Sequence, residues 1–432
     1  MKISILTLFP NLYDQFLKTS LVARAQEKNI VQFNVSSFFS YTEPKKRIDA
    51  PTFGPGAGML LKPEIVEKAI DDNDSKSGVS YKIFFSPHGK KLDQKLALDL
   101  SKRISKEKHV MLVCPRYEGM DARVEEYYAD EIISIGDYVL MGGDLPCMVL
   151  LEALLRLIPG VVSKEESVEQ ESFSSAFVDY PEYTEPVEWK GMKVPDIVRS
   201  GNHAEIKKWR SEQAVQRTVI DHFDWLSSHV TSSLDKKLSI ATIPSHYVAL
   251  MHSDVILRDG IPGTTSVTSL DLHDIARSAC TYAIEHYFIV TPLVDQQKIV
   301  QKMLDFWMSD WAISYNPHRH EAVSKIMVID TLDAMINQIE QWHGKKPVLI
   351  ATSAHDTELS QKITYNDQGL VWKLGHPVLF LLGTGGGLSI DLLHRCDFVL
   401  TPIEGFSDFN HLSVRSAAAI ILDRWLGISL KK

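Results

Sequence analysis

The sequence predicts a protein with two α/β domains, separated by a small helical module and a linker. The chain has 432 residues, about three times the length of a typical single domain. In both halves, short apolar runs alternate with amphipathic stretches, a pattern typical of parallel sheets covered by helices. A polar segment rich in Ser and Glu interrupts this alternation after residue 158. We therefore expect one sheet on each side of that segment.

The first half contains five apolar runs that predict buried strands. These runs cover residues 2–9, 30–38, 81–86, 109–114 and 130–136, and helical patterns cover 11–28, 93–105 and 145–157. Three strands lead directly into unusual loops, which have the sequences SPHG (86–89), CPRYEG (114–119) and SIGDYVLMGGDLP (134–146). Ligands of parallel α/β sheets bind at the carboxyl ends of the strands. These loops are therefore the expected site.

The middle of the chain has a different character. Residues 158–178 predict an exposed connector, and residues 179–226 predict helices. The helical part carries a basic cluster around Trp209, made of Lys207, Lys208, Arg210 and Arg217. The Ser/Thr-rich stretch that ends at Pro244 predicts an inter-domain linker.

A second α/β pattern follows the linker. Its predicted strands cover residues 246–253, 285–292, 324–331, 346–352, 377–387 and 397–403, and an apolar helix covers 412–426. The expected domain boundaries are 1–160 for the first α/β domain, 161–230 for the connector and helical module, 231–245 for the linker and 246–432 for the second α/β domain.

Composition excludes several classes of protein. With 44% hydrophobic and 23% charged residues, the chain is an ordinary globular protein. Its 4 cysteines form no C-x-x-C pair, which favours a reducing cytoplasm over a disulfide scaffold. The most apolar long stretch, 138–162, contains Asp144, Glu152 and Arg156, so we expect no membrane span. The net charge of −9 gives no general attraction to nucleic acid, and we expect no DNA partner.

Two glycine-rich loops raise the alternative of a nucleotide-dependent oxidoreductase. The first, FGPGAGM (53–59), follows a polar segment, whereas the second, GTGGGLS (383–389), follows a predicted strand. Leu388 occupies the position where the dinucleotide fingerprint has its last glycine. The match is partial, and either loop could simply form a tight turn.

Longer motifs in the first half indicate a family. They are LTLFP (6–10), GMLLKP (58–63), SPHGKKLDQ (86–94), RYEGMD (116–121), SIGDYVLMGGDLP (134–146), RLIPGV (156–161) and SGNHAEIKKWR (200–210). Residues 1–230 closely resemble the bacterial tRNA (guanine-N1)-methyltransferases, SPOUT-class enzymes that use S-adenosylmethionine. The resemblance implies a deep trefoil knot at the carboxyl end of the sheet. It also implies tRNA as the partner, guanine 37 (3′ of the anticodon) as the target, and an obligate homodimer whose active sites lie across the knot interface.

The resemblance implies that three loops bind the cofactor. The candidate S-adenosylmethionine-binding residues are Ser86, Pro87, Pro115, Tyr117, Glu118, Gly119, Ser134, Ile135, Gly136, Asp137, Tyr138, Val139, Leu140, Gly142 and Gly143. Glycines suit this role because they let the main chain approach a ligand closely. By the same resemblance, Glu118 lies near the methionine end of the cofactor, as a candidate Mg²⁺ contact.

Methylation at guanine N1 needs a base for the N1 proton and a cation for charge that develops at O6. The resemblance assigns these roles to Glu171 and Arg156. Family members usually have Asp at the position of Glu171, and the alternative is that Glu171 is one acid among several in a solvated connector. Arg156 could instead pair with Glu152 on its own helix. Pro115 replaces a usual glycine, which removes a backbone donor.

Local clusters of basic residues could attract RNA although the net charge of the chain is negative. They are Lys45, Lys46, Arg47, Lys90, Lys91 and the Lys207–Arg217 cluster. Ala50 stands where many family members have a second Asp after Asp49, and this difference affects a contact to RNA. The target base must be unpaired or turned out of its stack to expose N1.

The second α/β domain is similar to another SPOUT-like RNA methyltransferase domain. The motifs are HYVALMHSDV (246–255), LLGTGGGLS (381–389) and VLTPIEGFSDFNHLSVRSAAAIILDRWLG (399–427). The resemblance implies a second S-adenosylmethionine pocket with Gly383, Gly385, Ile403 and Leu412 as wall residues, and a side chain at Gly385 is expected to clash with the ligand. The substrate of this domain is not readable from the sequence. The alternative is that one or both domains are non-catalytic RNA-binding modules, which the changes at Glu171 and Pro115 favour.

Overall fold

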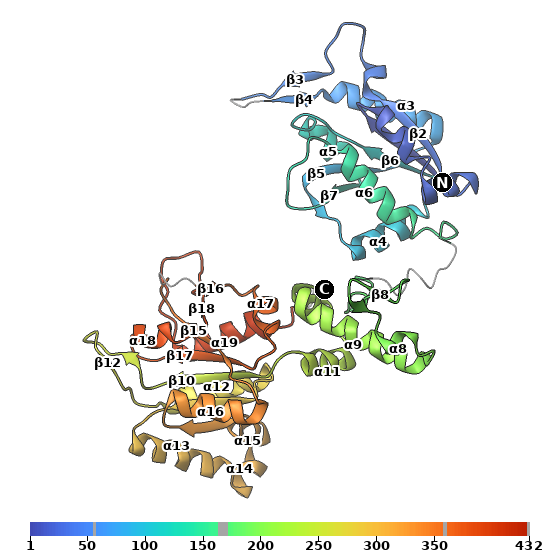
Figure 1. Ribbon diagram of the computed structural model, residues 1–432. Coiled ribbons are helices and arrows are strands. Elements are labelled where there is room, and N and C mark those ends of the chain that lie inside the picture. Colours follow the sequence, from blue (N-terminus) through green and yellow to red (C-terminus); the bar gives the residue numbers. More distant parts are fainter. Residues whose placement is uncertain (55–57, 163–171, 357–360, 430–432) are drawn as a thin grey trace. The chain divides into compact units, whose positions relative to one another are not determined.

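The computed structural model describes residues 1–54, 58–162, 172–356 and 361–429. The chain divides into two compact units, Met1–Ser174 and Ser175–Lys432, coloured blue to teal and green to red, respectively, in Figure 1. We call them the N-terminal unit and the C-terminal unit. No helix in the described ranges is long and apolar enough to cross a membrane.

The N-terminal unit contains a five-stranded sheet in the order β2-β1-β6-β5-β7. Its strands are β1 (Lys2–Thr7), β2 (Gln32–Ser37), β5 (Tyr81–Lys91), β6 (His109–Val113) and β7 (Glu131–Ser134). All neighbouring pairs are parallel, as the alternating pattern predicts. β5 continues beyond Phe85, and its register with β7 shifts between Phe85 and Lys90. The SPHG residues therefore form an irregularity within a strand, not a separate loop.

Helices cover both faces of this sheet. They are α1 (Tyr13–Phe16), α2 (Ser20–Glu27), α3 (Pro63–Ser77), α4 (Gln94–Ile104), α5 (Ala122–Tyr128) and α6 (Asp144–Leu155). One core lies beneath α2, α4 and α6, and the other beneath α3 and α5. The single helix predicted over 11–28 is wrong, because Thr19 is extended and the chain starts a new helix at Ser20. A short hairpin, β3 (Asp49–Pro51) with β4 (Met59–Leu61), lies outside the sheet.

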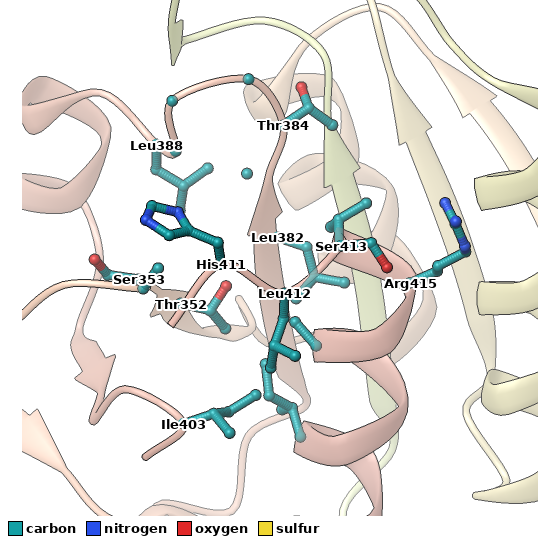
Figure 2. Close-up of a pocket in the computed structure, with 18 of the residues that line it drawn as sticks. Thr352, Ser353, Leu382, Thr384, Leu388, Ile403, His411, Leu412, Ser413 and Arg415 are labelled. Atoms are coloured by element: carbon teal, nitrogen blue, oxygen red, sulfur yellow. The ribbon is translucent and has the colours of Figure 1, made fainter. Parts of the chain in front are cut away.

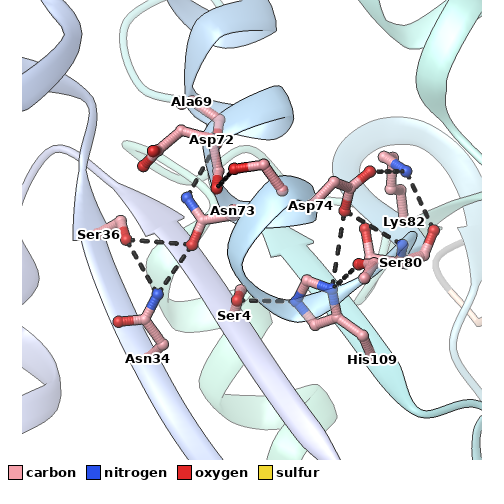
Figure 3. Close-up of polar contacts among 12 residues, drawn as sticks. Ser4, Asn34, Ser36, Ala69, Asp72, Asn73, Asp74, Ser80, Lys82 and His109 are labelled. Carbon is pink, nitrogen blue, oxygen red and sulfur yellow. Dashed lines mark hydrogen bonds and ion pairs between the residues drawn. The ribbon is translucent and has the colours of Figure 1, made fainter.

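A buried polar network joins the amino ends of β1, β5 and β6 (Figure 3). Lys82 is only 7% exposed, and its ammonium group lies 2.9 Å from a carboxylate oxygen of Asp74. The ring of His109 bonds the Gly78 carbonyl oxygen at 2.7 Å and the Ser4 hydroxyl at 2.9 Å. This network lies at the opposite end of the strands from the predicted site.

The C-terminal unit contains a seven-stranded sheet in the order β14-β13-β10-β17-β15-β18-β16. Its strands are β10 (His246–Met251), β13 (His286–Val290), β14 (Ile326–Ile329), β15 (Val348–Thr352), β16 (Lys362–Ile363), β17 (Val378–Gly383) and β18 (Phe398–Leu400). Every pairing is parallel. The central strands β10 and β17 are almost entirely buried, as expected for strands covered on both faces.

Helices cover both faces of this second sheet as well. They are α12 (Ser269–Thr281), α13 (Val294–Trp307), α14 (Asp310–Tyr315), α15 (Pro317–Val323), α16 (Leu332–His343), α17 (Gln368–Trp372), α18 (Ile390–His394) and α19 (Val414–Leu426). A short hairpin of β11 (Val255–Ile256) and β12 (Pro262–Gly263) follows β10.

Four further helices precede the second sheet and belong to the C-terminal unit. They are α8 (Asp196–Arg199), α9 (His203–Asp221), α10 (Phe223–His229) and α11 (Ser233–Thr242). Val219 of α9 shares a core with Trp372 of α17, and Asp221 pairs with Lys373 at 2.7 Å. The segment 231–245, predicted as a linker, is mostly α11. Ser232 caps the helix, since its hydroxyl accepts from the Asp235 amide.

Candidate active sites

The N-terminal unit has a cavity of about 440 Å³ where β5, β6 and β7 end. Of the fifteen predicted cofactor residues, all except Asp137 line it. The Asp137 side chain is instead 82% exposed and pairs with Lys91. Glu125 also lines the cavity, and burial raises the pKa of its carboxyl group.

Backbone hydrogen bonds hold the loop at residues 115–119 against the cavity. The Glu118 amide donates to the Met59 carbonyl, and the Leu61 amide donates to the Gly119 carbonyl, both at 3.1 Å. These bonds give the GMLLKP motif its structural role, because β4 supports the cofactor loop. Pro115 lacks an amide donor, but its carbonyl accepts from the Gly143 amide at 2.8 Å.

The paired glycines 142 and 143 are needed because another segment passes directly over them. A Cβ atom at Gly142 would overlap the Arg116 side chain, and one at Gly143 would lie 2.6 Å from the Pro115 ring. Any side chain there would push the cofactor loop away. The two glycines therefore permit close packing of the loop, in addition to any direct contact with a ligand.

A buried carboxylate, Asp144, stabilises this arrangement, and the sequence analysis missed its role. Asp144 is 1% exposed and accepts hydrogen bonds from Thr7, Tyr13 and Arg116. The bond from Arg116 Nε is 2.8 Å long. Asp144 thus joins the end of β1, helix α1, the cofactor loop and the start of α6. In the sequence, only its position at the end of the GGD motif (142–144) could have indicated this role.

Of the two predicted catalytic residues, only Arg156 belongs to the described residues, and it does not line this cavity. Arg156 follows the last residue of α6, whereas the cavity touches the start of that helix at Gly143 and Pro146. Twelve helical residues span about 18 Å, so Arg156 lies far from the cavity of its own chain. Glu171 lies outside the described residues. Glu118 lines the cavity, and no cluster of three or more His, Cys, Asp or Glu suited to a metal occurs among the described residues.

The C-terminal unit has a cavity of about 740 Å³ at the carboxyl ends of β10, β15, β17 and β18. Its lining includes all four predicted wall residues, Gly383, Gly385, Ile403 and Leu412. Figure 2 shows Ile403 and Leu412 on one side of the glycine loop, with Thr384 and Leu388 at the loop itself. His411 and Ser353 also face this space.

A glycine is needed at position 385 because a side chain there would collide with the protein itself, whereas the sequence analysis expected a collision with the ligand. It adopts a left-handed φ of +62°, and a Cβ atom there would lie 2.8 Å from the Ile256 carbonyl oxygen. That oxygen also accepts a hydrogen bond from the Gly386 amide at 2.6 Å. A side chain at Gly385 would therefore collide with β11 of the protein itself, before any collision with a ligand.

In the comparisons with known proteins, a different family model matches the part of the chain around each cavity, and the first match extends past Ser174 into the C-terminal unit. The family model described as tRNA (Guanine-1)-methyltransferase TrmD matches residues 1–228, and the model described as SAM-dependent RNA methyltransferase matches residues 245–427. A tRNA (guanine-N(1)-)-methyltransferase from Nitratidesulfovibrio vulgaris is 36% identical over 437 residues, 99% of each chain. One from Oleidesulfovibrio alaskensis is 36% identical over 440 residues, 100% of each chain.

A shorter relative matches only the first part of the chain. The tRNA (guanine-N(1)-)-methyltransferase of Bacillus subtilis is 41% identical over 239 residues, which is 55% of this chain and 97% of the relative. The N-terminal part therefore has the length of a complete relative, to which a second methyltransferase domain has been added. From the matching family model and the full-length relatives, the chain belongs to the TrmD family of tRNA (guanine-N1)-methyltransferases, which has the SPOUT fold.

Proposed function

We propose that the N-terminal part of the chain transfers a methyl group from S-adenosylmethionine to N1 of guanine 37 in tRNA. The observation that carries this proposal is the cavity at the ends of β5, β6 and β7, which is lined by the residues that the family motifs assign to the cofactor. A site made of backbone loops and glycines suits a bent cofactor that presents many polar atoms. The proposed location of this reaction is the cytoplasm.

We assign the proton chemistry to Glu171 and Arg156. The bound cofactor supplies the methyl group, and the protein must remove the N1 proton and stabilise negative charge at O6. A carboxylate at Glu171 accepts the proton, and the guanidinium of Arg156 faces O6. A Mg²⁺ ion, if used, would be held by Glu118 together with oxygens of the bound ligands.

A homodimer explains why Arg156 lies far from the cavity of its own chain. Leu145 (58% exposed) and Val149 (44% exposed) form an apolar strip on α6, and Glu152 and Arg156 continue the same helical face. Val139 and Met141, both more than four-fifths exposed, extend the strip. If two copies pair through this face about a two-fold axis, the end of one α6 approaches the start of the other.

The remaining assignments concern the knot, the domains and the RNA surface. We propose that the cofactor loops form a trefoil knot, supported by the bonds that join residues 115–119 to Gly143. We propose the same domain boundaries as the sequence analysis: 1–160 for the first α/β domain, 161–230 for the connector and helical module, 231–245 for the linker and 246–432 for the second α/β domain. The basic cluster on α9 would contact tRNA, with Arg210 stacked over Tyr180 at 4.6 Å.

For the second α/β domain we propose S-adenosylmethionine-dependent methylation of RNA. The support is the matching family model and the cavity around the GTGGG loop. The rival function, a non-catalytic RNA-binding module, predicts cofactor or RNA binding without a second methylated nucleoside.

The experiment measures methyl incorporation into a tRNA transcript, with mass mapping of the product. Arg156→Ala and Glu171→Gln are each expected to lower formation of 1-methylguanosine by about 10² or more, the usual scale for such groups. Binding of S-adenosylmethionine, measured by calorimetry, should change little, because backbone loops hold the cofactor.

Arg24→Ala and Glu27→Gln are matched controls, since both side chains lie exposed on α2 and carry no assigned role. Both should retain full activity. Loss of cofactor binding in Arg156→Ala would show a structural role for that residue. Full activity of Glu171→Gln would place the base elsewhere, and a methyl group at another atom or position would contradict the proposed reaction.

A further inference from the structure

The C-terminal cavity contains a buried histidine with one ring nitrogen unpaired. His252 follows β10, lines the cavity and is 1% exposed. Its Nδ1 atom lies 2.9 Å from the Thr265 hydroxyl. Its Nε2 atom is shielded from solvent and has no hydrogen-bond partner among the described residues. Buried polar atoms are normally paired, so an exception inside a cavity points to a ligand.

A chain of hydrogen bonds fixes which nitrogen of His252 carries the proton. The Thr384 hydroxyl donates to the Met251 carbonyl at 2.8 Å, so its single hydrogen is used. At 2.6 Å, the Thr265 hydroxyl must therefore donate to Thr384. Thr265 has no second hydrogen, so His252 Nδ1 must donate to Thr265. The free Nε2 atom is then an acceptor with an unused lone pair.

His246, at the other end of β10, shows how the protein satisfies such a lone pair when no ligand is involved. Its Nδ1 donates to the Pro244 carbonyl at 2.6 Å. Its Nε2 accepts from the indole groups of Trp372, at 3.2 Å, and Trp425, at 3.0 Å. Burial lowers the pKa of both His246 and His252 to about 4. Both rings are neutral acceptors at neutral pH, but only His246 has its acceptor filled.

The strand order divides the cavity into two halves. β10 lies on one side of β17, and β15 and β18 lie on the other. Of the predicted cofactor walls, Ile403 follows β18, and Gly383 ends β17 between the two halves. His252 belongs to the half near β10, together with the further lining residues Thr265, Thr268, Asp271 and Arg415.

The second half of the cavity contains one guanidinium group, Arg415, which is paired with two carboxylates. Arg415 lies 3.4 Å from Asp271 and 3.6 Å from Asp274, and its side chain is 37% exposed. Figure 2 shows Arg415 on the opposite side of the cavity from Thr352 and Ser353. A partly exposed guanidinium can hold a phosphate, and a neutral imidazole acceptor can hold a nearby N–H or O–H group.

We propose that His252 is a substrate-binding residue, whose Nε2 accepts a hydrogen bond from an N–H or O–H group of the RNA nucleotide bound beside the cofactor, with Arg415 on its phosphate. This inference rests on the RNA methyltransferase activity proposed for the second α/β domain. It restricts the recognised group to one that carries hydrogen: an amino group, an imino group or a ribose hydroxyl. It disfavours a bare ring nitrogen, which offers only a lone pair.

The test is nitrogen NMR of the histidine rings in the full-length protein. Three states are compared: free protein, protein with S-adenosylmethionine alone, and protein with total RNA from cells whose gene lacks residues 246–432. We expect His252 to be protonated at Nδ1 with an unbonded Nε2 in the first two states. RNA should shift Nε2 to the bonded range, and His246, already paired to two tryptophans, is the internal control that should not move.

Two variants give a second readout. His252→Phe removes the acceptor and should lower the yield of the second methylated nucleoside by about tenfold or more, as expected for one lost hydrogen bond to a buried group. His252→Gln keeps a polar atom near Nε2 and should restore part of the yield. Affinity for S-adenosylmethionine and formation of 1-methylguanosine in the same reaction should not change.

Three results would overturn the proposal: an Nε2 already bonded in the free protein, an Nε2 that shifts with S-adenosylmethionine alone, or no shift with RNA. If RNA shifts Nε2 while the wild-type protein makes no second methylated nucleoside, the contact stands. In that case the proposed activity of the second domain fails instead.

Discussion

The two cavities lie at the same edge of their sheets, but they are completed in different ways. In the N-terminal unit, the loops around Gly142 are held by the buried carboxylate Asp144, and Arg156 does not line the cavity. In the C-terminal unit, the loop around Gly385 is held by the backbone of Ile256, and a buried histidine with a free acceptor lines the cavity.

The difference shows that a shared fold does not dictate how a site acquires its chemistry. Parallel strands deliver loops to one edge in both units, and glycines let those loops pack tightly. Under the proposed function, the N-terminal cavity would receive Arg156 from a second copy of the chain. The C-terminal cavity has an unpaired acceptor, His252 Nε2, within its own unit.

The largest expected effect is that of Gly385→Val. The change places a β-branched side chain at a left-handed φ and against the Ile256 carbonyl oxygen, so we expect a loss of more than about 4 kcal/mol of stability in the C-terminal unit. Calorimetry of the full-length protein should show its transition lowered or absent. Gly344→Val is the matched control, because Gly344 has a φ of +68° but nothing within 4 Å of its Cβ position. Left-handed strain alone should cost about 1–2 kcal/mol. Equal losses of stability in both variants would show that the contact with Ile256 does not contribute.

The second prediction compares the two ends of the N-terminal sheet. Asp74→Asn leaves Lys82 buried without its carboxylate, which should cost about 3–5 kcal/mol. Asp144→Asn removes the partner of Arg116 and should cost a similar amount. Only Asp144→Asn should weaken binding of S-adenosylmethionine, by about tenfold or more, since a loop shift costing 1.4 kcal/mol already has this effect. Calorimetric titration below the melting temperature separates the outcomes. Equal cofactor affinity in the two variants would show that Asp144 does not position the loop.

The third prediction is a difference in acid sensitivity between the units. Burial lowers the pKa of His246 and His252 from 6.5 to about 4. Between these values the unfolded chain binds more protons than the folded one, so stability falls as pH falls from 6.5 toward 4, by roughly 3 kcal/mol for each histidine. In the N-terminal unit, pairing with Arg47 and Lys76 lowers the pKa of Asp49 and Asp72 below 3.8. The contribution of those carboxylates to stability is lost only when the pH falls below about 3.8.

Calorimetry at about pH 7 and about pH 4.5 should therefore show the transition of the C-terminal unit falling first. His252→Gln should reduce this acid sensitivity, because one of the histidines whose pKa is lowered by burial no longer titrates. Transitions that move together would mean that the two units do not respond to acid independently.

The sequence by itself determined the two parallel α/β architectures and most strands of the two large sheets, but it missed β16 and read the SPHG part of β5 as a loop. These features depend on local patterns: alternating apolar runs, glycines and strand-to-loop motifs that are contiguous in the chain. Asp137 shows the limit of this reasoning, because its neighbours line the cavity while its own side chain is exposed. A motif places the backbone, but it does not state which way each side chain points.

Only the tertiary structure decided the features that join distant segments. Asp144 gathers Thr7, Tyr13 and Arg116, and the protonation state of His252 depends on Thr265 and Thr384, 13 and more than 100 residues away. Most of the serine-rich segment 231–245 folds as helix α11, with Ser232 as its N-terminal cap. Hydrogen bonds and buried charges act over a few ångströms in space, so their partners follow from the path of the chain and not from spacing along it.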